Sequence, residues 1–112
     1  MKLTNKISVF VPSTYEGNKP AKRLQKKAVK HTAKYLCKYF GGSTAQEAQG
    51  FWDSPEKGLI TEKQVIVFAQ CTDTDLHNNR EKVFNIAKAI CKYMKQEAVT
   101  ITVNNEMFFV EA

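Results

Sequence analysis

Apolar and polar residues alternate near the start of the chain. Ile7, Val9 and Val11 fall on one side, and Ser8 and Phe10 fall on the other. A period of two is typical of a strand with one buried face. We therefore expect the first strand of a sheet here.

A longer period follows between residues 20 and 40. Its apolar positions recur every three or four residues, as in a helix with one buried face, and they are Leu24, Ala28, Val29, Ala33, Leu36 and Phe40. The preceding stretch, PSTYEGNKP, is rich in turn-forming residues and predicts a loop, and Pro20 suits the first position of the helix. Gly41 and Gly42 predict the end of this helix.

Residues 43–72 predict a long hairpin. The segment from Asp53 to Gly58 has turn chemistry and lies between two strand-like runs. The second run, from Val65 to Cys71, is rich in branched and aromatic residues. We therefore expect this run to lie centrally in the sheet, between other strands.

The remainder of the chain predicts a second helix and a terminal hairpin. The stretch TDTD at 72–75 offers N-cap residues. Helical spacing then continues to an end near Gln96, through Val83, Ile86, Ala87, Ile90 and Met94. Alternation over residues 99–103, followed by Asn104 and Asn105, predicts a last strand that folds back on itself.

The predicted order is strand, helix, strand, strand, helix, strand, with an extra edge strand at the C-terminus. It indicates an α+β protein of ferredoxin-like plan, βαββαβ, in which an antiparallel sheet carries both helices on one face. A chain of 112 residues has the length of one domain. We therefore expect a single domain over residues 1–112.

Five short landmarks accompany these elements. They are VPST after the first strand, FGG after the first helix, QGFW before a turn, Glu62 after that turn, and QEAV before the last strand. With these landmarks the chain resembles, from Val9 to Val103, a family of small uncharacterised bacterial, phage or plasmid-borne proteins. The resemblance implies the same order of elements and an origin on bacterial or mobile-element DNA, and it implies no catalytic residues.

Charge changes the picture of the first helix. The chain has 17 Lys and Arg against 11 Asp and Glu, a net charge of +6, which attracts anions. No acid occurs between Glu16 and Glu47, and at about 100° per residue the basic residues of this helix share one face: Lys22, Arg23, Lys26, Lys27, Lys30, Lys34 and Lys38. This face is expected either to bind a polyanion, above all nucleic acid through its phosphates, or to be only the solvated side of an amphipathic helix.

Phe10 and Phe68 are expected on the sheet face that the helices leave uncovered. Aromatic residues on such strands stack bases in RNA-recognition domains of this plan. The glycine and aromatic motif of those domains is absent from EKQVIVFAQ. We therefore favour burial of this face against a second copy of the chain, in a homodimer.

Trp52, Glu62 and Gln96 form a further candidate group, as a pocket or an interface. Trp52 lies beside the predicted turn and Glu62 begins the next strand, so these two are expected to be close. Gln96 closes the second helix together with Glu97, where the helix dipole does not favour a carboxylate. The alternative is structural, with Trp52 as a packing anchor and the polar side chains bonded to backbone ends.

The sequence offers no catalytic constellation. We find no triad, no paired acids at a usable spacing and no glycine-rich phosphate loop. Cys37, Cys71 and Cys91 fit the reduced, buried thiols of a cytosolic protein, and His31 and His77 lack neighbours at metal-ligand spacing. We therefore expect no metal and no cofactor, and the first apolar run is too short for a signal sequence or a membrane span.

These observations predict a small, cytoplasmic, non-enzymatic protein that binds nucleic acid through the basic face of its first helix. One alternative is a phage- or plasmid-encoded factor that binds a host protein or a small nucleotide. A second alternative is an enzyme of the dimeric ferredoxin-like-barrel type, with Trp52 and Glu62 at a pocket. No membrane association is expected.

Overall fold

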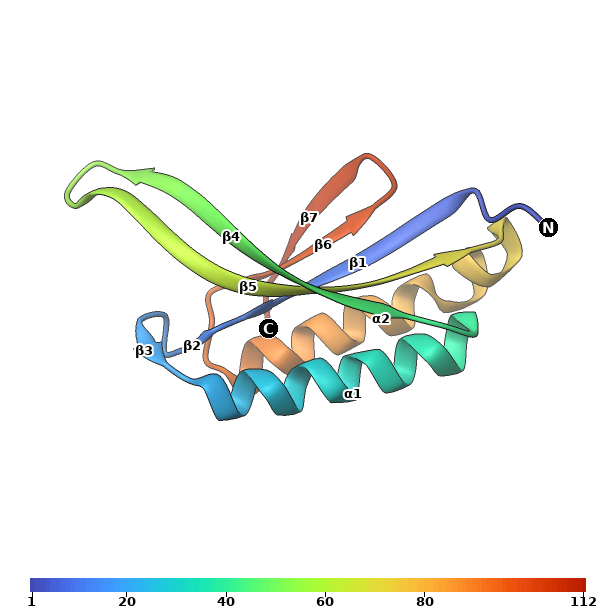
Figure 1. Ribbon diagram of the computed structural model, residues 1–112, viewed down its shortest axis with the longest axis horizontal. Coiled ribbons are helices and arrows are strands. Elements are labelled where there is room, and N and C mark those ends of the chain that lie inside the picture. The colour runs from blue at the N-terminus through green and yellow to red at the C-terminus, as the bar shows by residue number, and fades with distance from the viewer.

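Five strands form one antiparallel sheet, and two helices cover one of its faces (Figure 1). The computed structural model describes all residues, 1–112. The strands lie in the order β4-β5-β1-β6-β7, with the bounds β1 Asn5–Pro12, β4 Thr44–Ser54, β5 Gly58–Cys71, β6 Val99–Val103 and β7 Glu106–Val110. The predicted ferredoxin-like plan is confirmed, and β7 is the predicted C-terminal edge strand.

The two helices are α1, Lys22–Phe40, and α2, Asp73–Tyr93. Helix α1 ends at Gly41, whose φ of 90° is a left-handed conformation that glycine adopts without strain. Helix α2 begins at Thr72, whose hydroxyl accepts a hydrogen bond of 3.2 Å from the backbone N–H of Asp75. Both signals were predicted from the sequence.

The core lies between the helices and the inner face of the sheet. Ile7, Val9 and Val11 of β1 are fully buried there, with Leu36 of α1 and Val83 of α2. They belong to one cluster of 17 buried residues. Full burial of each such side chain stabilises the fold by about 1.5–3 kcal/mol, so the alternating pattern of β1 determines which face meets the helices.

The segment between β1 and α1 differs from the predicted loop. It contains a small hairpin of β2, Thr14–Tyr15, and β3, Lys19–Pro20. Pro20 therefore belongs to a strand and does not begin the helix. The backbone N–H of Ala21 instead donates to the carbonyl of Ser13 at 2.9 Å, which closes this hairpin before α1 starts.

One further detail of the predicted fold is corrected. Helix α2 ends at Tyr93 and not near Gln96, because Lys95 takes a left-handed φ of 48° and turns the chain toward β6. Strand β5 pairs with both β4 and β1, so the run from Val65 to Cys71 lies inside the sheet, as predicted.

The hairpin of β4 and β5 extends beyond the helices, at the left of Figure 1. It gives the molecule extents of 47 × 26 × 23 Å. Three large apolar side chains near its tip are exposed, namely Phe51, Trp52 and Leu59. Neither helix combines the length and the apolar character that a membrane crossing would need.

Candidate functional site

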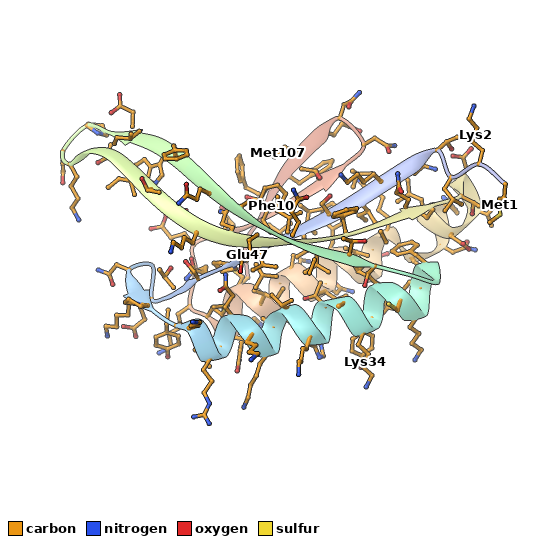
Figure 2. All side chains as sticks on the ribbon, in the orientation of Figure 1. Met1, Lys2, Phe10, Lys34, Glu47 and Met107 are labelled. Atoms are coloured by element: carbon orange, nitrogen blue, oxygen red, sulfur yellow. The ribbon has the colours of Figure 1, made fainter.

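The sheet face opposite the helices carries the residues that alternate with the core. Phe10 of β1 pairs with Ile66 of β5, and Glu62 of β5 pairs with Gly50 of β4. Opposed residues in an antiparallel pair share a face. Figure 2 shows Phe10 and Met107 on this side, away from the helices, and we call it the open sheet face.

A pocket of about 630 Å³ lies where the end of β1 and the first half of β5 meet the loop between α2 and β6. Its size falls in the range of small-molecule sites. Its lining comes from several strands and two loops, and consists of Phe10, Pro12, Glu16, Gly17, Glu62, Gln64, Lys95, Gln96, Glu97, Ala98, Val99, Thr100 and Phe109. The pocket is thus assembled from residues that are far apart in the sequence.

The charged groups of the pocket are mainly acidic. Glu16, Glu62 and Glu97 contribute three carboxylates against one ammonium, that of Lys95. The chain as a whole has a net charge of +6. The pocket therefore has the opposite sign to the molecule, and it favours a ligand with positive charge.

Aromatic rings form another part of the wall. Phe10 is half-buried, and Phe109 of β7 is 71% exposed although it is a large apolar residue. Phe109 pairs across the strands with Thr100, which also lines the pocket. An exposed ring beside acidic groups can stack on a flat heterocycle or attract a cation.

Two loops meet at the polar end of the pocket. The backbone N–H of Glu16 donates to the carbonyl of Met94 at 3.0 Å. The side-chain amide of Gln96 donates to the carbonyl of Thr14 at 2.7 Å and to that of Met94 at 3.1 Å. Gln96 therefore joins the β2–β3 hairpin to the end of α2, as the structural alternative for this residue expected.

An ion pair completes this junction. Oε1 of Glu16 lies 3.5 Å from Nζ of Lys95, and Oε2 lies 2.8 Å from Nζ of Lys19. The hydrogen bond and charge of Lys19, with a smaller contribution from Lys95, hold the pKa of Glu16 below its usual value. Contact with Tyr15 and then Glu16 raises the pKa of Lys95. We call this pair the Glu16–Lys95 clasp.

The basic residues of α1 lie elsewhere. All seven of them are exposed, as the helical period predicted: Lys22, Arg23, Lys26, Lys27, Lys30, Lys34 and Lys38. Lys34 points away from the sheet on the outer side of α1, whereas Phe10 lies on the open sheet face (Figure 2). None of the seven lines the pocket.

Trp52 and Phe68 also lie outside the pocket. Trp52 pairs with Ile60 in the extended part of the β4–β5 hairpin and is 50% exposed. Phe68 is half-buried farther along β5, where the ammonium of Lys6 lies 4.1 Å from its ring centroid. Of the five residues predicted for a pocket or interface, the structure brings together Phe10, Glu62 and Gln96.

Sequence reasoning missed several lining residues, above all Glu16, Lys95 and Phe109. The sequence landmarks did point toward the pocket as a whole. QEAV supplies four consecutive lining residues, 96–99, and VPST and Glu62 supply one more each. No group of three or more His, Cys, Asp or Glu side chains is placed to hold a metal ion.

The architecture places the chain among α+β proteins of ferredoxin-like fold. No protein-family model and no curated protein sequence matches it. A phage SAM lyase in complex with S-methyl-5′-thioadenosine has a TM-score of 0.68 and 17% identity, over 100% of this chain and 95% of that chain. A phage SAM lyase in the apo state gives 0.68 and 17%, over 100% and 94%.

CutA from Pyrococcus horikoshii, in guanidine hydrochloride, has a TM-score of 0.50 and 12% identity, over 97% of this chain and 84% of that chain. The TM-scores show a shared fold, and at identities this low the likeness extends to the fold alone.

These comparisons contradict the function predicted from the sequence. The whole chain shares its fold with an enzyme, so the prediction of a non-enzymatic protein that holds nucleic acid through α1 is wrong. Its physical basis was the charge pattern of a single helix. That pattern describes an exposed surface, whereas the acidic pocket appears only when distant segments of the chain come together.

Proposed function

We propose that the protein is a lyase that binds S-adenosylmethionine in this pocket and releases S-methyl-5′-thioadenosine. The observation that carries the proposal is the acidic and aromatic lining of the pocket on a positively charged chain. The full-length likeness to phage SAM lyases supports it. S-adenosylmethionine combines a flat heterocycle, a sulfonium cation and an amino acid, and each of these has a counterpart in the lining.

The aromatic wall provides the place for the adenine. Phe10 and Phe109 supply rings beside the hydroxyl of Thr100. Stacking of a base on an aromatic side chain contributes about 1–3 kcal/mol. The carboxylates of Glu62 and Glu97 then lie in the same pocket for the sulfonium and for the ribose hydroxyls, which donate hydrogen bonds.

The reaction that fits this lining needs no external base. When the bond between sulfur and the side-chain carbon breaks, its electron pair stays on sulfur, and the cation becomes the neutral thioether. The carboxylate of the same substrate forms the new bond to that carbon and closes a lactone. No proton is transferred, and the α-ammonium keeps the single net positive charge of the substrate. The pocket acts mainly by holding the carboxylate in line with the breaking bond.

Incubation of the purified protein with S-adenosylmethionine tests the proposal. We expect S-methyl-5′-thioadenosine and a four-carbon lactone, separated by chromatography. In the variant Glu62→Gln the loss of a charged contact should lower kcat/KM by about tenfold or more. Glu47→Gln is the matched control, because Glu47 is an exposed carboxylate outside the pocket. A folded protein that forms no thioether product contradicts the proposal.

The cytoplasm is the compartment that this proposal requires. Cys37, Cys71 and Cys91 are all free thiols, which fits a reducing environment. S-adenosylmethionine would have to be present in the same compartment.

A further inference from the structure

Two charged residues of the pocket occupy backbone conformations that charged residues seldom adopt. Glu16 has a φ of 52° and Lys95 a φ of 48°. The left-handed region favours Gly, Asn and Asp, so a long side chain there is uncommon. Of the three non-glycine residues with positive φ, only Asn104 is of a favoured type. The chain thus retains Glu and Lys where smaller residues would fit with less strain.

The structure also fixes the two residues relative to each other. The backbone N–H of Glu16 donates to the carbonyl of Met94, the residue before Lys95, at 3.0 Å. The side-chain amide of Gln96, the residue after Lys95, donates to the carbonyl of Thr14 at 2.7 Å. Both loops are therefore held by hydrogen bonds that do not involve the charged side chains.

The charged ends of the clasp remain accessible. The side chain of Glu16 is 41% exposed and that of Lys95 is 59% exposed, and both line the pocket. Exposed ion pairs contribute little to stability, so the clasp is a weak explanation for the strained backbone. A carboxylate and an ammonium 3.5 Å apart match the two ends of an α-amino acid, which has one group of each sign on a single carbon.

We propose that the Glu16–Lys95 clasp binds the α-amino acid end of the ligand. Nζ of Lys95 donates to the ligand carboxylate, and the carboxylate of Glu16 accepts from the ligand α-ammonium. The ligand carboxylate has two oxygens, so one can contact Lys95 while the other remains free to attack. This assignment rests on the proposed function and names the residues that distinguish S-adenosylmethionine from nucleosides without the amino acid.

Two uncleavable nucleosides provide the test. S-adenosylhomocysteine has the amino acid end, S-methyl-5′-thioadenosine lacks it, and neither contains a sulfonium. Calorimetric titration of the full chain should show tighter binding of S-adenosylhomocysteine. In Lys95→Asn and in Glu16→Gln its affinity should fall by about tenfold or more, and the affinity for S-methyl-5′-thioadenosine should change by less than about twofold.

The variants are chosen so that misfolding does not obscure the result. Asn tolerates the left-handed conformation of position 95, so Lys95→Asn should unfold at a temperature no lower than the parent protein does. Lys95→Arg keeps the positive charge at this position and should, unlike Lys95→Asn, bind S-adenosylhomocysteine more tightly than S-methyl-5′-thioadenosine. Lys19→Gln is the matched control, because Lys19 contacts Glu16 at 2.8 Å but does not line the pocket.

The outcomes separate the two proposals. A parent protein that binds neither nucleoside overturns the proposed function and this assignment together. This assignment alone is overturned if the parent binds S-methyl-5′-thioadenosine and Lys95→Asn weakens the binding of both nucleosides equally or of neither. The clasp is then only a contact between loops.

Discussion

Burial in the sheet alters the chemistry of Cys71. This residue ends β5 and is 1% exposed. Loss of solvent, and then the nearby charges of Asp75 and Asp73, raise the pKa of its thiol above the usual value of 9.0. The thiolate is the reactive form of cysteine, so Cys71 should be inert in the folded protein.

Labelling with a thiol reagent at neutral pH checks this prediction. Cys37 is exposed, which corrects the burial expected for it from the sequence, and it should react at once. Cys71 and Cys91 are buried and should react only when the protein unfolds. Because the pKa of Cys71 is raised in the folded state, its contribution to stability is fully present below about pH 9 and is lost as the pH rises further. Equal labelling rates for all three thiols in the native protein would contradict the prediction.

The sequence indicated individual site residues only in part. Alternation placed Phe10 on the open sheet face, and the landmarks singled out Glu62 and Gln96. Trp52 was expected close to Glu62, and the register makes them diagonal neighbours on one face, since Trp52 pairs with Ile60 and Gly50 pairs with Glu62. The pocket nevertheless includes Glu62 and not Trp52. The side chain of Lys95 could not be placed, because a left-handed residue after a helix breaks the helical period on which the prediction depended.

At the scale of elements, the order and type of the helices and long strands followed from the sequence. Periods of 2 and 3.6 residues are clear over these lengths. The two-residue strands β2 and β3 were missed because so short a segment contains no period. The start of α1 was misplaced for the same reason, since Pro20 fits the end of a hairpin as well as the first turn of a helix.

The N-terminus of α2 provides a test at this scale. Replacement of Thr72 by Ala removes the side-chain acceptor of the Asp75 N–H and should lower the free energy of unfolding by about 1 kcal/mol. Urea denaturation measures this difference. Thr74→Ala is the control, because Thr74 lies exposed in the first turn and Ala is a better helix former. Equal stability of Thr72→Ala and the parent would show that the cap contributes nothing.

At the scale of the whole molecule, the helices leave the open sheet face uncovered. Several large apolar side chains on it or on the extended hairpin are exposed, namely Phe51, Trp52, Leu59, Met107 and Phe109. Large exposed apolar patches are typical of interfaces, and three of these side chains, Phe51, Trp52 and Leu59, lie near the tip of the hairpin. The homodimer expected from the sequence stays a prediction.

The molar mass in solution tests self-association. One chain has a mass of 12.7 kDa, and light scattering should give at least twice this value. Trp52→Ser should shift the equilibrium toward the single chain, because it removes exposed apolar area from the hairpin. Lys34→Ser, on the outer side of α1 (Figure 2), should leave the mass unchanged. A parent protein that remains a single chain at micromolar concentration contradicts the prediction.

Function was the part that sequence reasoning predicted least well. The charge of α1 is local and easily read, so it dominated the interpretation. The pocket depends on how β1, β5, β6 and β7 pair and on where two loops meet. No periodicity encodes such a convergence of distant segments.

The separation of charge between the acidic pocket and the basic outer side of α1 gives the molecule an electric dipole. A cationic ligand far from the protein experiences the repulsion of the net charge of +6, and only near the pocket does attraction prevail. The screening length falls from about 30 Å at 0.01 M salt to about 8 Å at 0.15 M. Salt therefore weakens the distant repulsion before it weakens the contact attraction, and moderate ionic strength should hasten the arrival of a cation.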